Sequence, residues 1–270
     1  MDVFFINLAS QGERRAFLER NFAASDTASW PLHRIEAVTA ADAAQVPGAL
    51  RDGEKACFLS HRKALEAAVR TDGHVLIAED DIQFGQHTAA ALETALKQIP
   101  ENAWDVVFTD VIFPGLDRMY QLFRLRQDYD ASGQSGLLDL SEMNFAGSIG
   151  YVVNSNAKGG LLHAANQDPS LDVPYDVWLK HLAQNRMLRA FVIFPFPTTQ
   201  SELGTQSQIQ IAAEKDIGAI WTAFRQLVWR ERDIDQAIRA LERANTQAAP
   251  DCAAMAKIFA LMLSPEFKDK

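Results

Sequence analysis

The chain has 270 residues, 48% of them hydrophobic, which suits one α/β domain with an appendage or two small domains around a sizeable core. A formal net charge of -9 leaves no overall basic surface for a phosphate backbone, so we expect no nucleic-acid partner. The two cysteines, Cys57 and Cys252, are too few and too far apart for a disulfide framework. They suit a reducing cytoplasm.

The N-terminus predicts a first strand rather than a signal peptide, because its short apolar run carries Asp2 and has no basic n-region. No stretch contains the roughly 20 uncharged apolar residues that a membrane-spanning helix needs. We therefore expect a cytoplasmic protein, at most bound peripherally at the inner membrane.

Strands and helices alternate through the first half of the chain. Apolar runs predict strands at residues 3–8, 33–38, 75–78 and 106–108. Helical spacing of apolar residues predicts a helix after each of the first three strands. This alternation is typical of a Rossmann-type α/β fold with a mostly parallel sheet.

In the second half of the chain, the periodicity of apolar residues changes twice. Residues 113–142 show little periodicity, which predicts a long loop or a small excursion over the active-site face. Strands are then expected at 147–153 and 190–194, and helices at 157–165 and 175–184. After about residue 212 three amphipathic helices are expected, around Trp221, Ile234 and Ile258. We therefore divide the chain into a main domain, 1–211, and a C-terminal helical extension, 212–270, separate from the chemistry.

Three acids, Glu79, Asp80 and Asp81, directly follow the buried strand at 75–78. Ligands of open α/β sheets bind at the carboxyl ends of the strands, and adjacent carboxylates repel one another unless a cation compensates. Oxygen ligands favour Mg²⁺ or Mn²⁺, whose shell is commonly completed by water and substrate phosphates. The triplet predicts a site for a metal and a nucleotide diphosphate. The alternative is an exposed acidic turn that caps the next helix.

Six short segments occur in an order that points to one family. They are Ile6-Asn7-Leu8 with Arg14-Arg15, 56–62 (ACFLSHR), 75–82 (VLIAEDDI), 147–154 (GSIGYVVN), Val173-Pro174-Tyr175-Asp176 and 195–200. Together they resemble glycosyltransferase family 25, which includes lipooligosaccharide-synthesis and procollagen galactosyltransferases. The acids at 79–81 match the family's counterpart of the DxD motif. Ser10, Lys55 and Ala78 depart from the family pattern without removing a carboxylate.

The resemblance implies a GT-A-like domain over residues 1–211. It would carry out inverting transfer of a hexose, galactose or glucose, from a UDP-sugar to a hydroxyl of a glycan or glycolipid. The product would be lipopolysaccharide, lipooligosaccharide or another surface glycan. Mn²⁺ or Mg²⁺ would neutralise the departing diphosphate, with Asp81 and Asp80 as ligands. Asp176 is the expected general base and Asp110 its reserve. The donor-binding residues would be Asn7, Leu8, Arg14, Arg15, His61, Glu79, Asp80, Gly147, Ser148 and Gln200.

Several of these residues also have a structural interpretation. His61 could be a hydrogen-bonded core histidine, and Arg14 and Arg15 could face solvent. An amphipathic stripe in the C-terminal extension suits a buried core, a homodimer seam or a membrane surface, and it consists of Trp221, Arg225, Trp229 and Arg230.

A response-regulator receiver is the main rival, with Asp110 as phosphoacceptor and Lys158 as the switch lysine. Spacing argues against it, because only one helix fits between Asp81 and Asp110, where a receiver needs a helix, a strand and a second helix. A second alternative, a catalytically inactive glycosyltransferase-like binding module, stays open.

Overall fold

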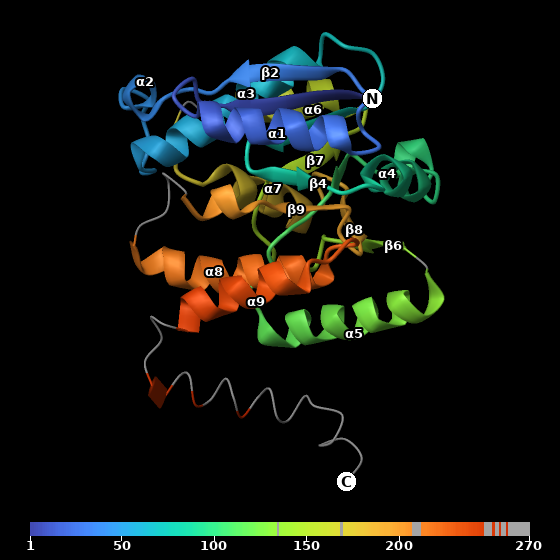
Figure 1. Ribbon diagram of the computed structural model, residues 1–270. Coiled ribbons are helices and arrows are strands. Elements are labelled where there is room, and N and C mark those ends of the chain that lie inside the picture. The colour runs from blue at the N-terminus through green and yellow to red at the C-terminus, as the bar shows by residue number, and fades with distance from the viewer. Residues whose placement is uncertain are drawn as a thin grey trace.

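The computed structural model describes residues 1–133, 135–167, 170–206 and 212–245 and the single residues 250, 251, 254 and 258. Its centre is a seven-stranded sheet in the order β2-β1-β3-β7-β5-β8-β6, and a smaller sheet pairs β4 with β9 (Figure 1). The strands are β1 (Asp2–Asn7), β2 (Leu32–Glu36), β3 (Val75–Glu79), β4 (Ile82–Phe84), β5 (Val106–Phe108), β6 (Gly136–Asp139), β7 (Gly150–Val153), β8 (Ala190–Phe194) and β9 (Thr198–Gln200).

Five strands of the large sheet run in the same direction, namely β1, β2, β3, β5 and β8. β7 lies between β3 and β5 and runs antiparallel to both, and β6 is an antiparallel edge strand on β8. The predicted α/β fold with a mostly parallel sheet is confirmed. The carboxyl ends of β1, β3 and β5 meet at one edge of the sheet, where open α/β folds bind ligands.

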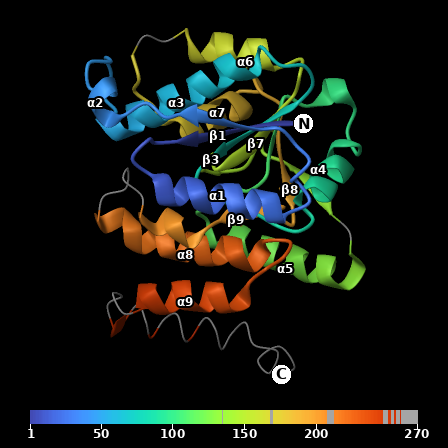
Figure 2. The same cartoon turned by 45° about the horizontal axis from the view of Figure 1, so that its top comes forward.

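Helices cover both faces of this sheet (Figure 2). The helices of the described residues are α1 (Gly12–Ala24), α2 (Ala40–Ala43), α3 (Asp52–Ala68), α4 (Thr88–Leu96), α5 (Leu116–Ser132), α6 (Lys158–Ala165), α7 (Tyr175–Gln184), α8 (Ala212–Val228) and α9 (Ile234–Asn245), with short 3-10 turns at Glu101–Ala103 and Glu202–Gln206.

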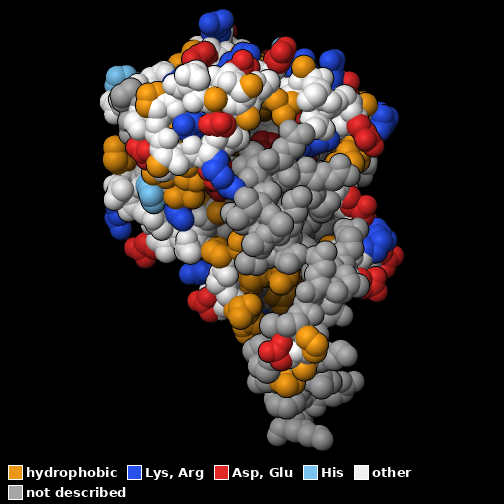
Figure 3. Space-filling view, turned by 90° about the vertical axis from the view of Figure 1, so that its left-hand side faces the viewer, with side chains coloured by type: hydrophobic (Ala, Val, Ile, Leu, Met, Phe, Trp, Pro, Cys, Tyr) orange, Lys and Arg blue, Asp and Glu red, His pale blue; other side chains and the backbone are white. Residues whose placement is uncertain are grey.

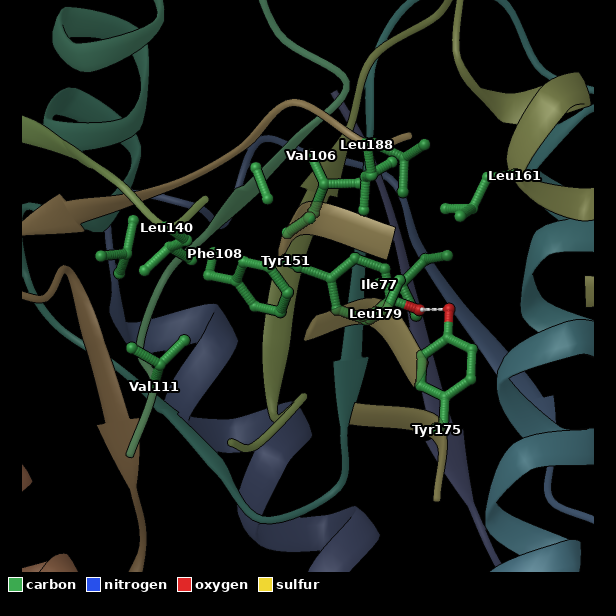
Figure 4. Packing of buried hydrophobic residues seen from close by; sticks show 14 of the residues in the cluster. Ile77, Val106, Phe108, Val111, Leu140, Tyr151, Leu161, Tyr175, Leu179 and Leu188 are labelled. Atoms are coloured by element: carbon green, nitrogen blue, oxygen red, sulfur yellow. Dashed lines mark hydrogen bonds between the residues drawn. The ribbon is translucent and has the colours of Figure 1, made fainter. Parts of the chain in front are cut away.

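Successive side chains of a strand point to opposite faces of the sheet, and each face has its own hydrophobic core. In β1, Phe4 and Ile6 join the core with α3, α6 and α7, whereas Phe5 joins the core with α1 and α4. β3 is buried on both faces, which explains its uninterrupted apolar sequence. Figure 4 shows the first core, where the hydroxyls of Tyr151 and Tyr175 lie 2.9 Å apart among apolar side chains that include Ile77 and Leu179.

The expectation of a loop at 113–142 is wrong, because this segment contains α5 and β6. The buried residues of α5 are Leu122 and Arg126, so the helix carries no apolar stripe that periodicity could detect. It ends at Gly133, whose φ of 71° is the left-handed conformation that glycine adopts without strain.

α8 and α9 confirm two of the three helices expected after residue 212, and the third, around Ile258, lies outside the described residues apart from Ile258 itself. α8 packs against α9, α5 and β9, and these helices lie side by side beyond the sheet (Figures 1 and 2). None of the helices in the described part of the chain is long and apolar enough to cross a membrane.

Candidate active site

The three acids divide between two neighbourhoods. Asp80 and Asp81 turn toward α1, where Arg14 Nη2 lies 2.7 Å from Asp80 Oδ1 and 3.0 Å from Asp81 Oδ2. Asn7, the last residue of β1, donates from Nδ2 to Asp80 Oδ2 over 2.7 Å. Asp80 and Asp81 are buried, with 6% and 5% of their surfaces exposed. The ends of β1 and β3 thus bring Asn7, Arg14 and two of the three acids together.

A positive charge already lies between Asp80 and Asp81, because the Arg14 guanidinium contacts both carboxylates. Two atoms of this group, Asp81 Oδ1 and Arg14 Nε, are buried without a hydrogen-bond partner. Such atoms are rare in folded proteins and call for a water, an ion or a ligand. Carboxylate oxygens are the ligands that Mg²⁺ and Mn²⁺ prefer, so the chemistry of Asp80 and Asp81 fits the predicted cation.

The acids differ in how readily they ionise. Burial raises the pKa of Asp80 to about 6, against the opposing charge of Arg14 and with added repulsion from Asp81. Burial also raises the pKa of Asp81, which Arg14 again opposes. Burial favours the neutral form of Glu79 as well, but the hydrogen bond and charge of His61 help to outweigh it and lower the pKa of Glu79. A cation at Asp80 and Asp81 would favour the charged form of both carboxylates.

Glu79 turns toward the second neighbourhood, formed by α3 and the loop before β7. Ser148 Oγ donates to Glu79 Oε1 over 3.0 Å, and His61 Nε2 lies 3.4 Å from the same oxygen. His61 is almost fully buried, stacks on Tyr175 and places Nδ1 3.0 Å from the Tyr151 hydroxyl. His61 is therefore a buried histidine that reaches Glu79. Its contact with a donor stays a prediction.

Asp176 holds the loop that contains Gly147. Its Oδ2 accepts the backbone N–H of Gly147 over 2.8 Å, and its Oδ1 accepts the N–H of Val177 over 2.9 Å. Gly147 has a φ of 93°, which favours glycine. Asp176 lies in the first turn of α7, where the sequence placed it. Its role as base stays a prediction, and the loop contact gives it a structural role in addition.

Asp110, two residues beyond β5, is fully buried against α8. Arg225 Nη1 lies 3.3 Å from Asp110 Oδ2, and Arg225 Nη2 donates to the side-chain oxygen of Gln200. Gln200 Nε2 in turn donates to Asp81 Oδ2 over 3.0 Å. Burial raises the pKa of Asp110 to about 6, although Arg225 opposes the shift. Because Asp110 has no exposed surface, this conformation gives an acceptor hydroxyl no access to it.

The contribution of α8 is what sequence reasoning missed. Besides Arg225, Thr222 Oγ1 donates to Gln200 Oε1 over 3.0 Å, and Gln226 Nε2 donates to the Gln200 carbonyl over 2.9 Å. The sequence did contain a signal for this contribution: Thr222, Arg225 and Gln226 lie on the buried side of an amphipathic helix. Buried polar side chains need hydrogen-bond partners, so these residues indicated polar contacts with the main domain. The division at residue 211 stays a prediction, but α8 contacts Asp110 directly and is linked to Asp81 through Gln200.

Two of the expected donor residues make other contacts. Arg15 is exposed on α1 and pairs with Glu19 over 2.8 Å. Leu8 is half-buried directly after β1, and its carbonyl accepts the N–H of Gln11 over 2.9 Å, at the start of α1. Neither side chain has a contact with the acids that supports its predicted role.

The protein is thus an α/β protein with buried carboxylates and arginines at the carboxyl edge of a mostly parallel sheet, the edge at which open α/β folds bind ligands. The family model "Glycosyltransferase family 25 (LPS biosynthesis protein)" matches residues 1–179. The chain belongs to this family, as the motifs indicated, and is by family a glycosyltransferase. The match includes the acids, Asp110 and Asp176, and ends before Gln200 and α8.

Among solved structures, the chain is similar to the mannosyltransferase PcManGT from Pyrobaculum calidifontis in complex with GDP-Man and Mn2+. The identity is 14% and the TM-score 0.41, over 99% of this chain and 81% of that chain. No curated protein matches the chain significantly. The family assignment therefore rests on residues 1–179.

Proposed function

We propose that the protein transfers a hexose, galactose or glucose, with inversion from a UDP-sugar to a hydroxyl of a glycan or glycolipid acceptor. The expected product is lipopolysaccharide, lipooligosaccharide or another surface glycan. The observation that carries the proposal is the buried pair Asp80 and Asp81, bridged by Arg14 and left with an unpartnered Asp81 Oδ1. This arrangement suits a diphosphate and a hard cation together.

Asp80 and Asp81 would hold Mn²⁺ or Mg²⁺, which when bound supplies positive charge to the departing diphosphate. Asn7 fixes the orientation of Asp80, and Gln200 does the same for Asp81. Arg14 has a different task. Once a cation compensates the two acids, its guanidinium is free to bind diphosphate oxygens, which match its planar donors.

Asp176 remains the proposed general base for the acceptor hydroxyl. It belongs to the same region as the Gly147 loop, beside Ser148 and Glu79. Both of its carboxylate oxygens accept a backbone N–H, from Gly147 and from Val177. Asp110, the reserve, is disfavoured by its burial against Arg225. The positive charge that the cation and Arg14 bring to the departing diphosphate would provide much of the rate acceleration.

The C-terminal helices are proposed to contact a membrane surface or a second copy of the chain. Ile234, Ile238 and Leu241 are exposed along α9 at helical spacing. Figure 3 shows hydrophobic side chains gathered on the lower part of the face it presents. The cytoplasmic location stays a prediction.

The test is hydrolysis and transfer from UDP-galactose and UDP-glucose by the full chain, with Mn²⁺, with Mg²⁺ and with a chelator. Cation-dependent release of UDP, lost in Asp81→Asn, is expected. Activity unchanged by chelator contradicts the cation assignment. Donor binding without turnover, measured by thermal shift, would instead support the inactive binding module.

A further inference from the structure

Cys57, His61 and Glu79 form a second group of potential ligands beside the aspartates. Cys57 and His61 are four residues apart on α3 and so share one face of the helix, which meets the end of β3. Cys57 is a free thiol. One ligand atom from each of the three side chains lies within 4.8 Å of the other two. Among the described residues, these side chains form the cluster of three His, Cys, Asp or Glu residues that is compact enough to hold a metal ion.

The surroundings fix the orientation of the His61 ring. The ring stacks on Tyr175, with centroids 4.2 Å apart and planes inclined by 4°. Its Nδ1 lies 3.0 Å from the Tyr151 hydroxyl, which lies 2.9 Å from the Tyr175 hydroxyl. Without a metal, Nε2 carries the proton that faces Glu79. With a metal bound, Nδ1 would donate to Tyr151 and Tyr151 to Tyr175, and the Nε2 lone pair would face the metal. Metal-binding histidines are held in this way by a hydrogen bond at the other ring nitrogen.

The contacts of Nε2 are long for hydrogen bonds and suitable for ligands. His61 Nε2 lies 3.4 Å from Glu79 Oε1 and 3.4 Å from Ser148 Oγ. Two nitrogen or oxygen ligands at about 2.1 Å from a tetrahedral Zn²⁺ are themselves about 3.4 Å apart. The nitrogen and the carboxylate oxygen therefore already have the separation of a coordinated pair. The thiol completes three protein ligands.

We propose that Cys57, His61 and Glu79 bind a thiophilic divalent cation of the Zn²⁺ class, at a site chemically distinct from the oxygen-only pair Asp80 and Asp81. Thiolate and imidazole select Zn²⁺ or Co²⁺ over Mg²⁺ and Mn²⁺. Water or Ser148 Oγ would occupy the fourth position. As the metal–sulfur bond forms, the Cys57 proton passes to solvent, so binding releases one proton. The cation ties α3 to the end of β3 and stabilises the fold.

Co²⁺ is the probe, because a cobalt–thiolate bond gives a charge-transfer band in the near ultraviolet. Reduced, chelator-treated full-length protein is titrated with Co²⁺. A band that saturates at one equivalent is expected, and Zn²⁺ but not Mg²⁺ should remove it. Cys252→Ser, the matched cysteine control, should keep the band, and Cys57→Ser should lose it. Asp81→Asn should keep it, because that residue belongs to the other site.

Two further variants separate coordination from an effect on folding. His61→Gln should raise the Co²⁺ dissociation constant at least about tenfold, and Tyr151→Phe, which removes the hydrogen bond to Nδ1, about 10- to 100-fold. Circular dichroism and thermal unfolding without metal establish that each variant is folded. No thiolate band in Cys252→Ser at excess Co²⁺ overturns the proposal. So does a band that survives Cys57→Ser, or one that Mg²⁺ removes as readily as Zn²⁺.

Discussion

Arg225 and Asp110 form an ion pair with a separation of 3.3 Å that is almost entirely removed from solvent. Arg225 belongs to α8, whereas Asp110 follows β5, so the pair ties the C-terminal helix to the centre of the sheet. The same guanidinium contacts Gln200, which donates to Asp81. The stability of the fold and the orientation of a proposed metal ligand therefore depend on one arginine.

Arg225→Met should lower the free energy of unfolding by about 3 to 5 kcal/mol, because it leaves the Asp110 charge buried without its partner. Urea unfolding at neutral pH measures the loss. The double variant Asp110→Asn, Arg225→Met should recover part of it, since neither charge is then buried. Arg239→Met is the matched control, because Arg239 is about half exposed and pairs with Glu202 at 3.6 Å. A loss no larger than that of Arg239→Met would show that the buried pair contributes nothing.

Asp110 should also make stability depend on pH. Its pKa in the folded protein is about 6, above the ordinary value of 3.8, so the folded state binds this proton more tightly than the unfolded state. The stabilisation is full below about pH 4 and is lost as the pH rises through about 6. Relative to Asp110→Asn, the wild type should lose at most about 3 kcal/mol between these limits, at about 1.4 kcal/mol per pKa unit. The free energy of unfolding of both proteins is measured by chemical denaturation across this pH range, with a chelator present. If it depends on pH in the same way in both proteins, the raised pKa of Asp110 is contradicted.

Arg14 should compete with the cation for Asp80 and Asp81. Arg14→Met removes a positive charge that contacts both acids, so Mn²⁺ affinity without donor should rise at least about tenfold. Donor affinity should fall, because a diphosphate-binding group is lost. Isothermal titration with Mn²⁺ and then with the UDP-sugar measures both effects. Arg15→Met is the control and should change neither, since Arg15 is exposed and pairs with Glu19. Weaker Mn²⁺ binding in Arg14→Met would mean that Arg14 supports the cation site instead.

Asp176→Asn tests the general base. The amide oxygen can still accept the Gly147 N–H, so the loop should keep its position while the proton acceptor is lost. We expect the turnover number to fall by about 10²- to 10⁴-fold, with donor affinity nearly unchanged. Steady-state kinetics and a donor titration separate the two quantities. Gly147→Ala is the companion variant, because strain at a φ of 93° should disturb the loop and weaken donor binding. If Asp176→Asn behaves like Gly147→Ala, Asp176 is a positioning residue.

The sequence predicted those features that depend on local pattern. The apolar run before Glu79 identified β3, the alternation of strands and helices identified the sheet, and motif order identified the family. It did not predict α5, whose few buried residues leave no stripe. Nor did it predict the pairing of β4 with β9, because segments more than 100 residues apart in the chain meet there.

The candidate site was predicted in composition but not in arrangement. The acids are adjacent in sequence, yet Glu79 contacts Ser148 while Asp80 and Asp81 contact Arg14. Glu79 is the last residue of β3, whereas Asp80 and Asp81 form the turn that leads into β4, so the chain changes direction between them. Arg225 was identified only as part of an amphipathic stripe, because its partner Asp110 is 115 positions earlier and no periodicity connects them.

The reversed direction of β7 decides which stretch of chain can be varied to change specificity. At the edge of the sheet that holds the acids, the parallel strands end and β7 begins. The residues that follow a parallel strand therefore lie at this edge, whereas for β7 the residues that precede the strand lie there. Gly147 and Ser148, which precede β7, therefore lie beside Asp176 and Glu79. A mutant library aimed at sugar preference should randomise the approach to β7 and spare the turn after Val153, which opens at the opposite end of the strand.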